Sequence, residues 1–347
     1  MFCRPIAIFK RIVMRQFFTI TLPLPTALQV LNLSNFFLHI FKKNQYLYEG
    51  TKIMKENCQK KFSGERAEYF SHDARYVNCT FLDGESPLKH GKNLLLEQTN
   101  FNYKYPLWNS ENATVKKSIF HDLSRSGLWY TKNTTIEDSI IEAPKEFRRC
   151  DGVFLKKVTF SNAEETLWNC RNIRLEQVYA KGDYFAMNSE NFKAEDFVLD
   201  GNYFLDGGKN IEIRNARLNS KDSFWNCENV EIYDSYICGE YLGWNSKNLK
   251  FVNCVIESNQ GLCYIDGLTL ENCSLINTDL AFEYSQNINA TITNKVDSIK
   301  NPGSGIINAE GIGTLIMNPL RVDVTKTQII CKNIEKKYSE DPNLNER

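Results

Sequence analysis

One feature of the sequence restricts the fold more than any other, a repeat of 19 to 21 residues. The stretch FWNCENVEI at 224–232 returns as LWNCRNIRL at 167–175 and as GWNSKNLKF at 243–251. A repeat this regular indicates one structural unit that stacks on copies of itself. With the second Asn of the motif as position 0, the repeated positions are Asp73, Asn93, Asn112, Asn133, Gly152, Asn172, Asn191, Asn210, Asn229, Asn248, Gly267 and Asn287.

The residue types in each repeat predict a turn followed by a strand. Position 0 holds only Asn, Gly and Asp, which best tolerate a left-handed backbone, so we expect a tight turn there. Positions +1 and +3 are mostly apolar and position +2 is mostly polar, which is the alternation of a strand with one buried face. Apolar residues also recur at positions −5 and +8, as in Leu205 and Leu218, and predict further core columns.

These columns favour an all-β fold, a single-stranded right-handed parallel β-helix (solenoid) of about 12 coils of 19–21 residues. The leucine-rich pattern of horseshoe proteins and the six-residue period of left-handed β-helices are both missing. We expect the β-helix domain with irregular end caps to span 54–330. Residues 1–53 are expected to be an N-terminal extension outside the fold, either an over-extended start or a weak targeting segment, and 331–347 a charged, disordered tail.

Composition restricts the partners and the compartment. The chain has 42 basic and 42 acidic side chains, so nothing predicts a nucleic acid or an anionic membrane as partner. Cys150, Cys170 and Cys227 share position −2 with Ser and Thr, which favours small buried free thiols, although a Cys150–Cys170 disulfide stays open. Free thiols indicate a reducing compartment, so we expect a cytoplasmic protein, or a secreted one if residues 1–53 act as a signal.

All five tryptophans fall at one position of the repeat, −4, next to the buried position −5. Alternation predicts that they face outward, with Asn residues at −3 turning inward and laddering from coil to coil. Two interpretations stay open: a row of platforms that binds a glycan, or an interface covered by a second subunit, which makes a homo-oligomer possible. The predicted binding residues are Trp108, Trp129, Trp168, Trp225, Trp244, Tyr184, Tyr241, Arg149 and Lys145.

Charged side chains gather beside the Trp positions. Glycoside cleavage requires paired carboxylates at ~5–5.5 Å or ~6.5–9.5 Å, and groups one or two coils apart would meet these separations. The candidate catalytic residues are Glu165, Asp183, Asp222, Asp206 and Arg148. The same oxygens could hold Ca²⁺, but no calcium motif supports it and the four His lack metal-ligand spacing, so no cofactor or metal is predicted.

From 62 to 305 the chain resembles an uncharacterised bacterial family, a domain of unknown function in the pectin-lyase-like right-handed parallel β-helix superfamily. The stretches that carry the resemblance are DGESPLKHGKN, KYPLWNS, SGLWYTKN, EAPKEFRRCDGV, ETLWNC, KGDYFAMNSEN, GEYLGWNSKNL and QGLCYIDGL. The resemblance implies the fold and no reaction, and the near-constant repeat length leaves no long loops to build a deep cleft.

Together these patterns predict a protein that binds a polysaccharide or oligosaccharide along the Trp positions and processes it with the adjacent carboxylates. Whether it is an enzyme stays open; if so, a glycoside hydrolase or polysaccharide lyase is expected. The alternative is a non-catalytic β-helix that binds through the same face or forms an interface there.

Overall fold

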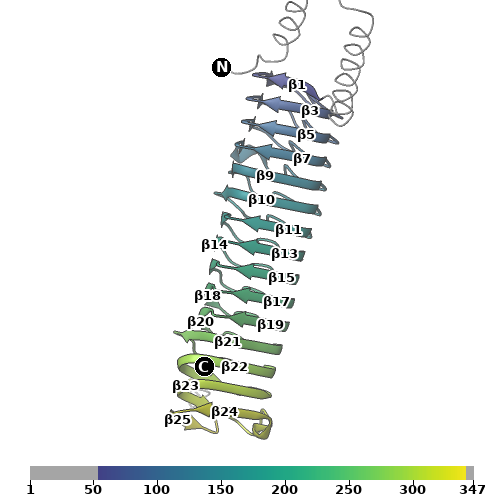
Figure 1. The fold of residues 1–347 in the computed structure, drawn as a ribbon. Coiled ribbons are helices and arrows are strands. Elements are labelled where there is room, and N and C mark those ends of the chain that lie inside the picture. The colour runs from purple at the N-terminus through teal and green to yellow at the C-terminus, as the bar shows by residue number, and fades with distance from the viewer. Residues whose placement is uncertain (1–53, 341–347) are drawn as a thin grey trace, which may run out of the picture.

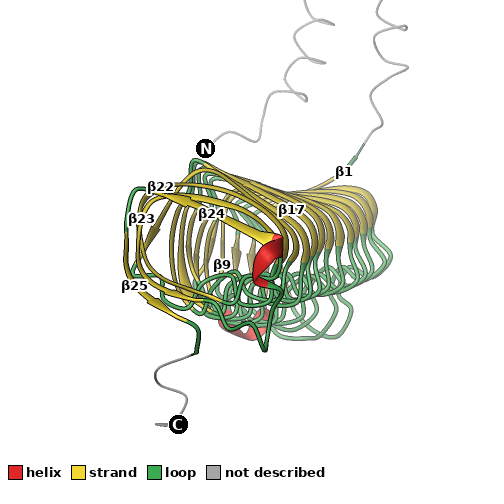
Figure 2. Ribbon diagram, turned by 90° about the horizontal axis from the view of Figure 1, so that it is seen from below, coloured by secondary structure: helices red, strands yellow, loops and turns green. Residues whose placement is uncertain are grey.

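The computed structural model describes residues 54–340 as an all-β parallel β-solenoid of about 15 turns. The coils stack into a rod, with Lys55–Cys58 (β1) at one end and Ile334–Tyr338 (β25) at the other (Figure 1). Viewed along the rod, the strands of successive coils superimpose (Figure 2). The predicted fold class is confirmed, and the predictions for residues 1–53 and 341–347 lie outside the described residues.

In the twelve regular coils the first strand starts one residue before position 0, so the left-handed residue expected in a turn is the second residue of that strand. Most coils add a shorter second strand. The first strands are β1 (Lys55–Cys58), β3 (His72–Val77), β5 (Lys92–Glu97), β7 (Glu111–Lys116), β9 (Lys132–Ile141), β10 (Asp151–Phe160), β11 (Arg171–Glu176), β13 (Glu190–Glu195), β15 (Lys209–Arg214), β17 (Glu228–Tyr233), β19 (Lys247–Val252), β21 (Asp266–Ile276), β22 (Gln286–Lys300), β23 (Gly305–Ile316) and β24 (Thr327–Cys331). The second strands are β2 (Lys61–Phe62), β4 (Thr80–Phe81), β6 (Asn100–Phe101), β8 (Ile119–Phe120), β12 (Tyr179–Lys181), β14 (Val198–Asp200), β16 (Arg217–Asn219), β18 (Tyr236–Glu240), β20 (Val255–Asn259) and β25 (Ile334–Tyr338). Two short 3₁₀ helices, η1 (Asp122–Ser124) and η2 (Val324–Lys326), complete the described elements.

The strands pair in parallel and in register, so each position of the repeat forms a column along the rod. Position +1, for example, pairs Ile173 with Phe192, Phe192 with Ile211 and Ile211 with Val230. The apolar columns at −5, +1, +3 and +8 are buried and belong to one continuous core. In the first coils this core includes stacked rings, such as Phe81 on Phe101 at 5.4 Å and Phe101 on Phe120 at 4.6 Å.

The number of coils exceeds the predicted 12, because three coils lack an Asn, Gly or Asp at the start of their strand. Lys55 pairs with Ala74, so β1 is a first coil that begins after Met54. At the other end Ile288 pairs with Gly305, and Gly305 with Thr327, which adds coils with steps of 17 and 22 residues. End coils stack on one neighbour only, so they need not keep the length of the repeat.

The expected tail from 331 onward is part of the solenoid as far as the structure describes it. β24 ends at Cys331, and β25 pairs with β23 through Ile312–Ile334 and Leu315–Lys337. The charged composition reflects exposure rather than disorder, since the last four residues of β25 are exposed and only Ile334 is partly buried.

Position 0 is left-handed in all twelve predicted turns, with φ between 51° and 80°, which confirms the predicted backbone conformation. Positions −7 and −3 are left-handed in all twelve of these coils as well, and position +5 in eleven. Their occupants include Tyr, Lys, Glu and Phe, for which a left-handed backbone costs roughly 1–2 kcal/mol. Each coil therefore carries several strained residues that its neighbours must stabilise.

Hydrogen bonds between coils offset this strain. The left-handed amide N–H of Tyr203 donates to the carbonyl of Lys221 in the next coil at 2.9 Å, and that of Asn226 donates to Trp244 at 3.0 Å. At position 0 the side chains add an amide ladder, in which Asn210 donates to Asn191 at 3.1 Å and Asn229 donates to Asn210 at 3.1 Å. The repeat is thus maintained by bonds that only a stacked neighbour can make.

The shared columns of Cys, Ser and Thr require a small side chain that can both donate and accept a hydrogen bond. The Cys170 thiol donates to the Phe147 carbonyl at 3.3 Å, and the Ser189 hydroxyl donates to the Leu167 carbonyl at 2.6 Å. The same Ser189 hydroxyl accepts the Cys170 amide N–H at 3.1 Å. No disulfide joins two cysteines within residues 54–340, and Cys150, Cys170 and Cys227 are buried thiols, in agreement with the prediction.

Replacement of Asn210 separates the contribution of the left-handed backbone from that of the amide ladder to the stability of a coil. We expect Asn210→Gly to cost about 1 kcal/mol in unfolding free energy, because it keeps the left-handed turn and loses the ladder bonds. Asn210→Val should cost ~1–3 kcal/mol more, because a β-branched residue is strained at positive φ. Urea unfolding monitored by circular dichroism measures both, and equal costs for the two variants would contradict the role of the turn.

Candidate functional site

The five tryptophans form a half-buried column on the outside of the solenoid. Trp108 packs on Trp129 with ring centroids 5.1 Å apart, and Trp225 on Trp244 at 5.9 Å. Trp244 also stacks on Tyr264, a position −3 residue of the next coil, at 4.9 Å. Neighbouring aromatic rings therefore cover part of each indole surface.

Between two of the tryptophans the column position is taken by Arg148. Its guanidinium lies 4.5 Å from the Trp129 ring centroid and 4.6 Å from that of Trp168, a double cation–π contact. The same guanidinium donates to Glu165 at 3.2 Å, and Lys145 donates to the other oxygen of that carboxylate at 3.2 Å. Arg148, Lys145 and Glu165 are thus brought together, and both oxygens of the Glu165 carboxylate are paired with these two cations.

Three tryptophans also use their indole N–H groups inside the molecule. Trp129 donates to the Lys145 carbonyl at 2.7 Å, Trp168 to Tyr184 at 2.6 Å and Trp225 to Tyr241 at 2.7 Å. These bonds reach the left-handed position −7 of the next coil and orient the ring against the surface. An indole held this way offers a ligand its remaining apolar face and no free donor.

The two predicted binding tyrosines line the same side of the solenoid. Tyr184 stacks on Tyr203 at 4.8 Å with nearly parallel rings, and Tyr241 contacts the edge of Trp244 at 5.5 Å. They come from position −7, the column that also holds Glu165 and Asp222, and Asp183 lies one column away at −8. Sequence reasoning did not include Tyr203, although it shares their column.

The other predicted catalytic carboxylates have separate surroundings. Asp183 accepts the Asn202 amide N–H at 2.8 Å, and Asp206 accepts from the Asn226 side chain at 2.8 Å. Asp222 is buried with one unpartnered oxygen, and this burial raises the pKa of its carboxyl above the ordinary value. Their catalytic role stays a prediction.

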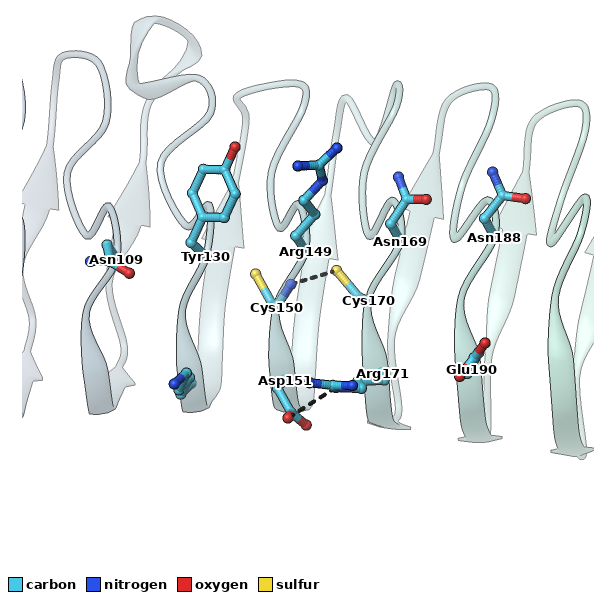
Figure 3. A pocket seen from close by; sticks show the side chains of 11 residues that line it. Asn109, Tyr130, Arg149, Cys150, Asp151, Asn169, Cys170, Arg171, Asn188 and Glu190 are labelled. Atoms are coloured by element: carbon cyan, nitrogen blue, oxygen red, sulfur yellow. Dashed lines mark hydrogen bonds and ion pairs between the residues drawn. The ribbon is translucent and has the colours of Figure 1, made fainter.

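A groove of about 570 Å³ runs across five coils beside the Trp column. One wall is the row of position −3 side chains, in which Tyr130, Arg149, Asn169 and Asn188 project in parallel from successive coils (Figure 3). The other wall holds the position −1 residues Lys132, Asp151, Arg171 and Glu190, and Cys150 and Cys170 lie between the rows.

The charges of the groove are only partly paired. Arg171 donates to Asp151 at 3.0 Å across neighbouring coils. Arg149, Lys132 and Glu190 form no ion pair with any residue in the described range. The groove therefore presents two free cations and one free carboxylate to solvent.

The orientation of position −3 was predicted incorrectly. Asn109, Asn169, Asn188, Asn226 and Asn245 are exposed rather than turned inward. The left-handed backbone at −3 breaks the alternation of a strand and directs two successive side chains, −4 and −3, to the outside. This extra outward row makes the groove, and Arg149 was the only one of its residues among the predicted ligands.

Within residues 54–340 no group of three His, Cys, Asp or Glu side chains is placed to hold a metal ion. In the same range no helix is long and apolar enough to cross a membrane.

Comparisons with known proteins identify the family. A family model described as "Protein of unknown function (DUF3737)" matches residues 55–330. None of the curated proteins shows significant sequence similarity to the chain. Similar solved structures include the surface adhesin PfbA of Streptococcus pneumoniae, with 8% identity, 82% of this chain and 83% of that chain covered, and a TM-score of 0.35.

Two further structures are similar at the same level. The A-module of mannuronan C-5 epimerase AlgE4 from Azotobacter vinelandii has 9% identity over 85% of this chain and 90% of its own, with a TM-score of 0.23. QnrB1, a plasmid-mediated fluoroquinolone resistance protein, has 13% identity over 65% of this chain and 90% of its own, with a TM-score of 0.22. Similarities this low carry no argument about ligand or reaction.

The neighbouring arginines at 148 and 149 separate a structural role from a binding role. We expect Arg148→Met to lower the free energy of unfolding by ~1–3 kcal/mol, because it removes two cation–π contacts and a partner of Glu165. Arg149→Met should change it by less than about 0.5 kcal/mol, because that side chain is exposed and free of ion pairs. Urea unfolding of both variants checks this, and equal effects would contradict the structural role of Arg148.

Proposed function

The chain belongs to the DUF3737 family of unknown function, and we propose that it is a glycan-binding β-helix whose ligand lies along the groove beside the Trp column. The observation that carries the proposal is the row of exposed polar side chains at position −3, repeated on successive coils about 4.8 Å apart. A polymer lying along the rod would meet a hydrogen-bonding group or a ring at each coil.

The chemistry of the groove suits a hydroxyl-rich ligand. Asn169 and Asn188 each offer a donor and an acceptor, and the Tyr130 ring offers an apolar face beside Trp129, at 6.3 Å between centroids. Arg149 adds five donors and no intramolecular ion pair within the described residues, so it is available for a sugar hydroxyl or carboxylate. Sugar recognition needs this combination of an apolar face and fixed polar groups.

We propose binding without catalysis. Glu165 is neutralised by Arg148 and Lys145, while Asp183 and Asp206 accept internal hydrogen bonds. Asp222 is only 3% exposed, so a glycan in the groove has little access to it. Glu165, Asp183 and Asp206 thus each have a structural task that accounts for their position.

The proposal predicts that the full-length protein binds a subset of polysaccharides on a glycan array. Calorimetry on the best ligand should show at least about tenfold weaker binding for Arg149→Ala and for Tyr130→Ala, because each loses a direct contact, worth ~1.4 kcal/mol or more. Arg125→Ala, at an exposed arginine outside the groove, is the matched control and should bind like the wild type.

Other outcomes distinguish the competing functions. Unchanged affinity in both groove variants would refute the groove as the binding site. Release of reducing ends or unsaturated products that Asp222→Asn abolishes would establish catalysis instead. A wild-type dimer in light scattering that Tyr130→Ala with Arg149→Ala converts to a monomer would identify this face as a subunit interface.

A further inference from the structure

Glu146 is a carboxylic acid in the interior of the solenoid, at position −6 beside the core. It is fully buried, and among the described residues only Asp222 is another buried carboxyl group. Its Oε2 accepts the amide N–H of Gly127 at 2.7 Å and that of Leu128 at 3.1 Å, whereas its Oε1 has no partner. Neither the groove nor the Trp column uses this group.

The hydrogen bonds between coils change direction at this residue. In the coils before it, the position −5 amide N–H donates to the position −6 carbonyl of the next coil, as Leu88 does to Pro106 at 3.0 Å and Leu107 to Gly127 at 2.8 Å. In the coils after it, the same amide donates to the preceding coil instead. Leu167 donates to Glu146 at 2.9 Å, Ala186 to Thr166 at 2.8 Å and Leu205 to Phe185 at 3.0 Å.

The backbone shows the same reversal. No residue at position −5 before Phe147 has a positive φ, whereas every one from Phe147 to Phe282 does, Gly243 included. A peptide plane that turns over between positions −6 and −5 produces both changes, because it exchanges the directions of the carbonyl and the N–H. The solenoid thus consists of two runs of coils with opposite peptide orientations at this corner.

At the boundary between the runs, no backbone carbonyl within residues 54–340 accepts the N–H of Leu128. The pattern before the reversal would pair its N–H with the Glu146 carbonyl, but that carbonyl already accepts from Leu167 on the far side. The Glu146 carboxyl accepts the Leu128 N–H in its place. Gly127 permits this geometry, because a Cβ there would lie 2.9 Å from Glu146 Oε2.

The boundary lies behind the groove. Trp129 and Tyr130 follow Leu128 directly, and Arg148 and Arg149 stand at the same positions of the next coil. The Trp129 indole N–H joins these two coils by donating to the Lys145 carbonyl. Any change at Glu146 therefore acts on the backbone that presents the central groove residues.

We propose that Glu146 joins the two runs of coils and makes their junction pH-sensitive. The neutral carboxyl accepts the N–H groups of Gly127 and Leu128, and its ionisation increases the opening of the coils behind the groove. A buried carboxylate with one unpartnered oxygen is costly unless a cation compensates it. The cations that flank Glu146 in the sequence, Lys145 and Arg148, are both engaged with Glu165. The titratable group that acts on Glu146 is the Cys150 thiol, which would disfavour a second negative charge.

The expected pH dependence follows from burial. Burial raises the pKa of the Glu146 carboxyl well above its usual range, although the bonds from Gly127 and Leu128 oppose the shift. In the unfolded chain an ordinary Glu titrates near ~4.3, so the folded protein retains the proton over a window above that pH. The stability that this group contributes is thus complete at low pH and is lost as the pH rises through its folded pKa.

The test compares the full-length wild type with Glu146→Gln and Glu146→Leu between pH 5 and pH 9 by hydrogen exchange of peptides covering 121–131. Gln retains an acceptor for both N–H groups and does not ionise, so the wild-type opening constant divided by that of Glu146→Gln should rise with pH, by up to about tenfold per pH unit. Glu164→Gln, at an exposed carboxyl one coil away, should behave like the wild type.

Glu146→Leu lacks an acceptor, so two buried N–H groups lose their partner. Its opening constant for 121–131 should be at least about tenfold higher than that of Glu146→Gln at every pH. A pH-independent ratio of wild type to Glu146→Gln would overturn the pH sensitivity. Equal protection of 121–131 in the Gln and Leu variants would overturn the junction itself. If the Leu variant does not fold, the pH dependence of wild type against Glu146→Gln decides alone.

Discussion

The structure depends on hydrogen bonding between coils in register. A single coil contains several left-handed non-glycine residues, each unfavourable by roughly 1–2 kcal/mol, and it cannot bury its own apolar columns. Both costs are offset only when a neighbouring coil accepts the left-handed N–H groups and covers the core side chains, as Lys221 accepts from Tyr203. Because each neighbour imposes the same requirement, the spacing of 19–21 residues persists through the twelve regular coils.

The same requirement creates the surface that we propose to be functional. A left-handed residue at −3 turns its side chain outward beside the already outward position −4, so two rows of exposed groups run along the rod. Most of the inner row packs on itself through Trp and Arg148, whereas the outer row keeps free polar groups such as Arg149. Position −4 therefore mainly stabilises the structure, and the neighbouring position −3 supplies the groups that we propose bind the ligand.

Glu146 shows what happens where the repeat cannot continue unchanged. The reversal of one peptide per coil leaves a boundary that no backbone carbonyl can close, and a side-chain carboxyl closes it at 2.7 and 3.1 Å. The boundary belongs to the coils that supply Tyr130 and Arg149 to the groove. The reversal of the peptide in the core and the groove residues Tyr130 and Arg149 thus lie in the same two coils.

The sequence alone determined the β-helix, its core columns and the turn at position 0, because periodic burial and the restriction to Asn, Gly and Asp are visible in the residues themselves. It also placed the tryptophans on one outer column. It did not establish the left-handed positions −7, −3 and +5. Asn recurs at −3, and Asn and Asp recur at +5, but Tyr105, Arg149 and Lys157 also occupy the three columns, and their strain is compensated by the next coil. It predicted the ends of the solenoid only as irregular end caps, without the coils of relaxed repeat length that form them, and it did not reveal the role of Glu146. Those features depend on which way a peptide points between two stacked coils, and only the tertiary structure decides that direction.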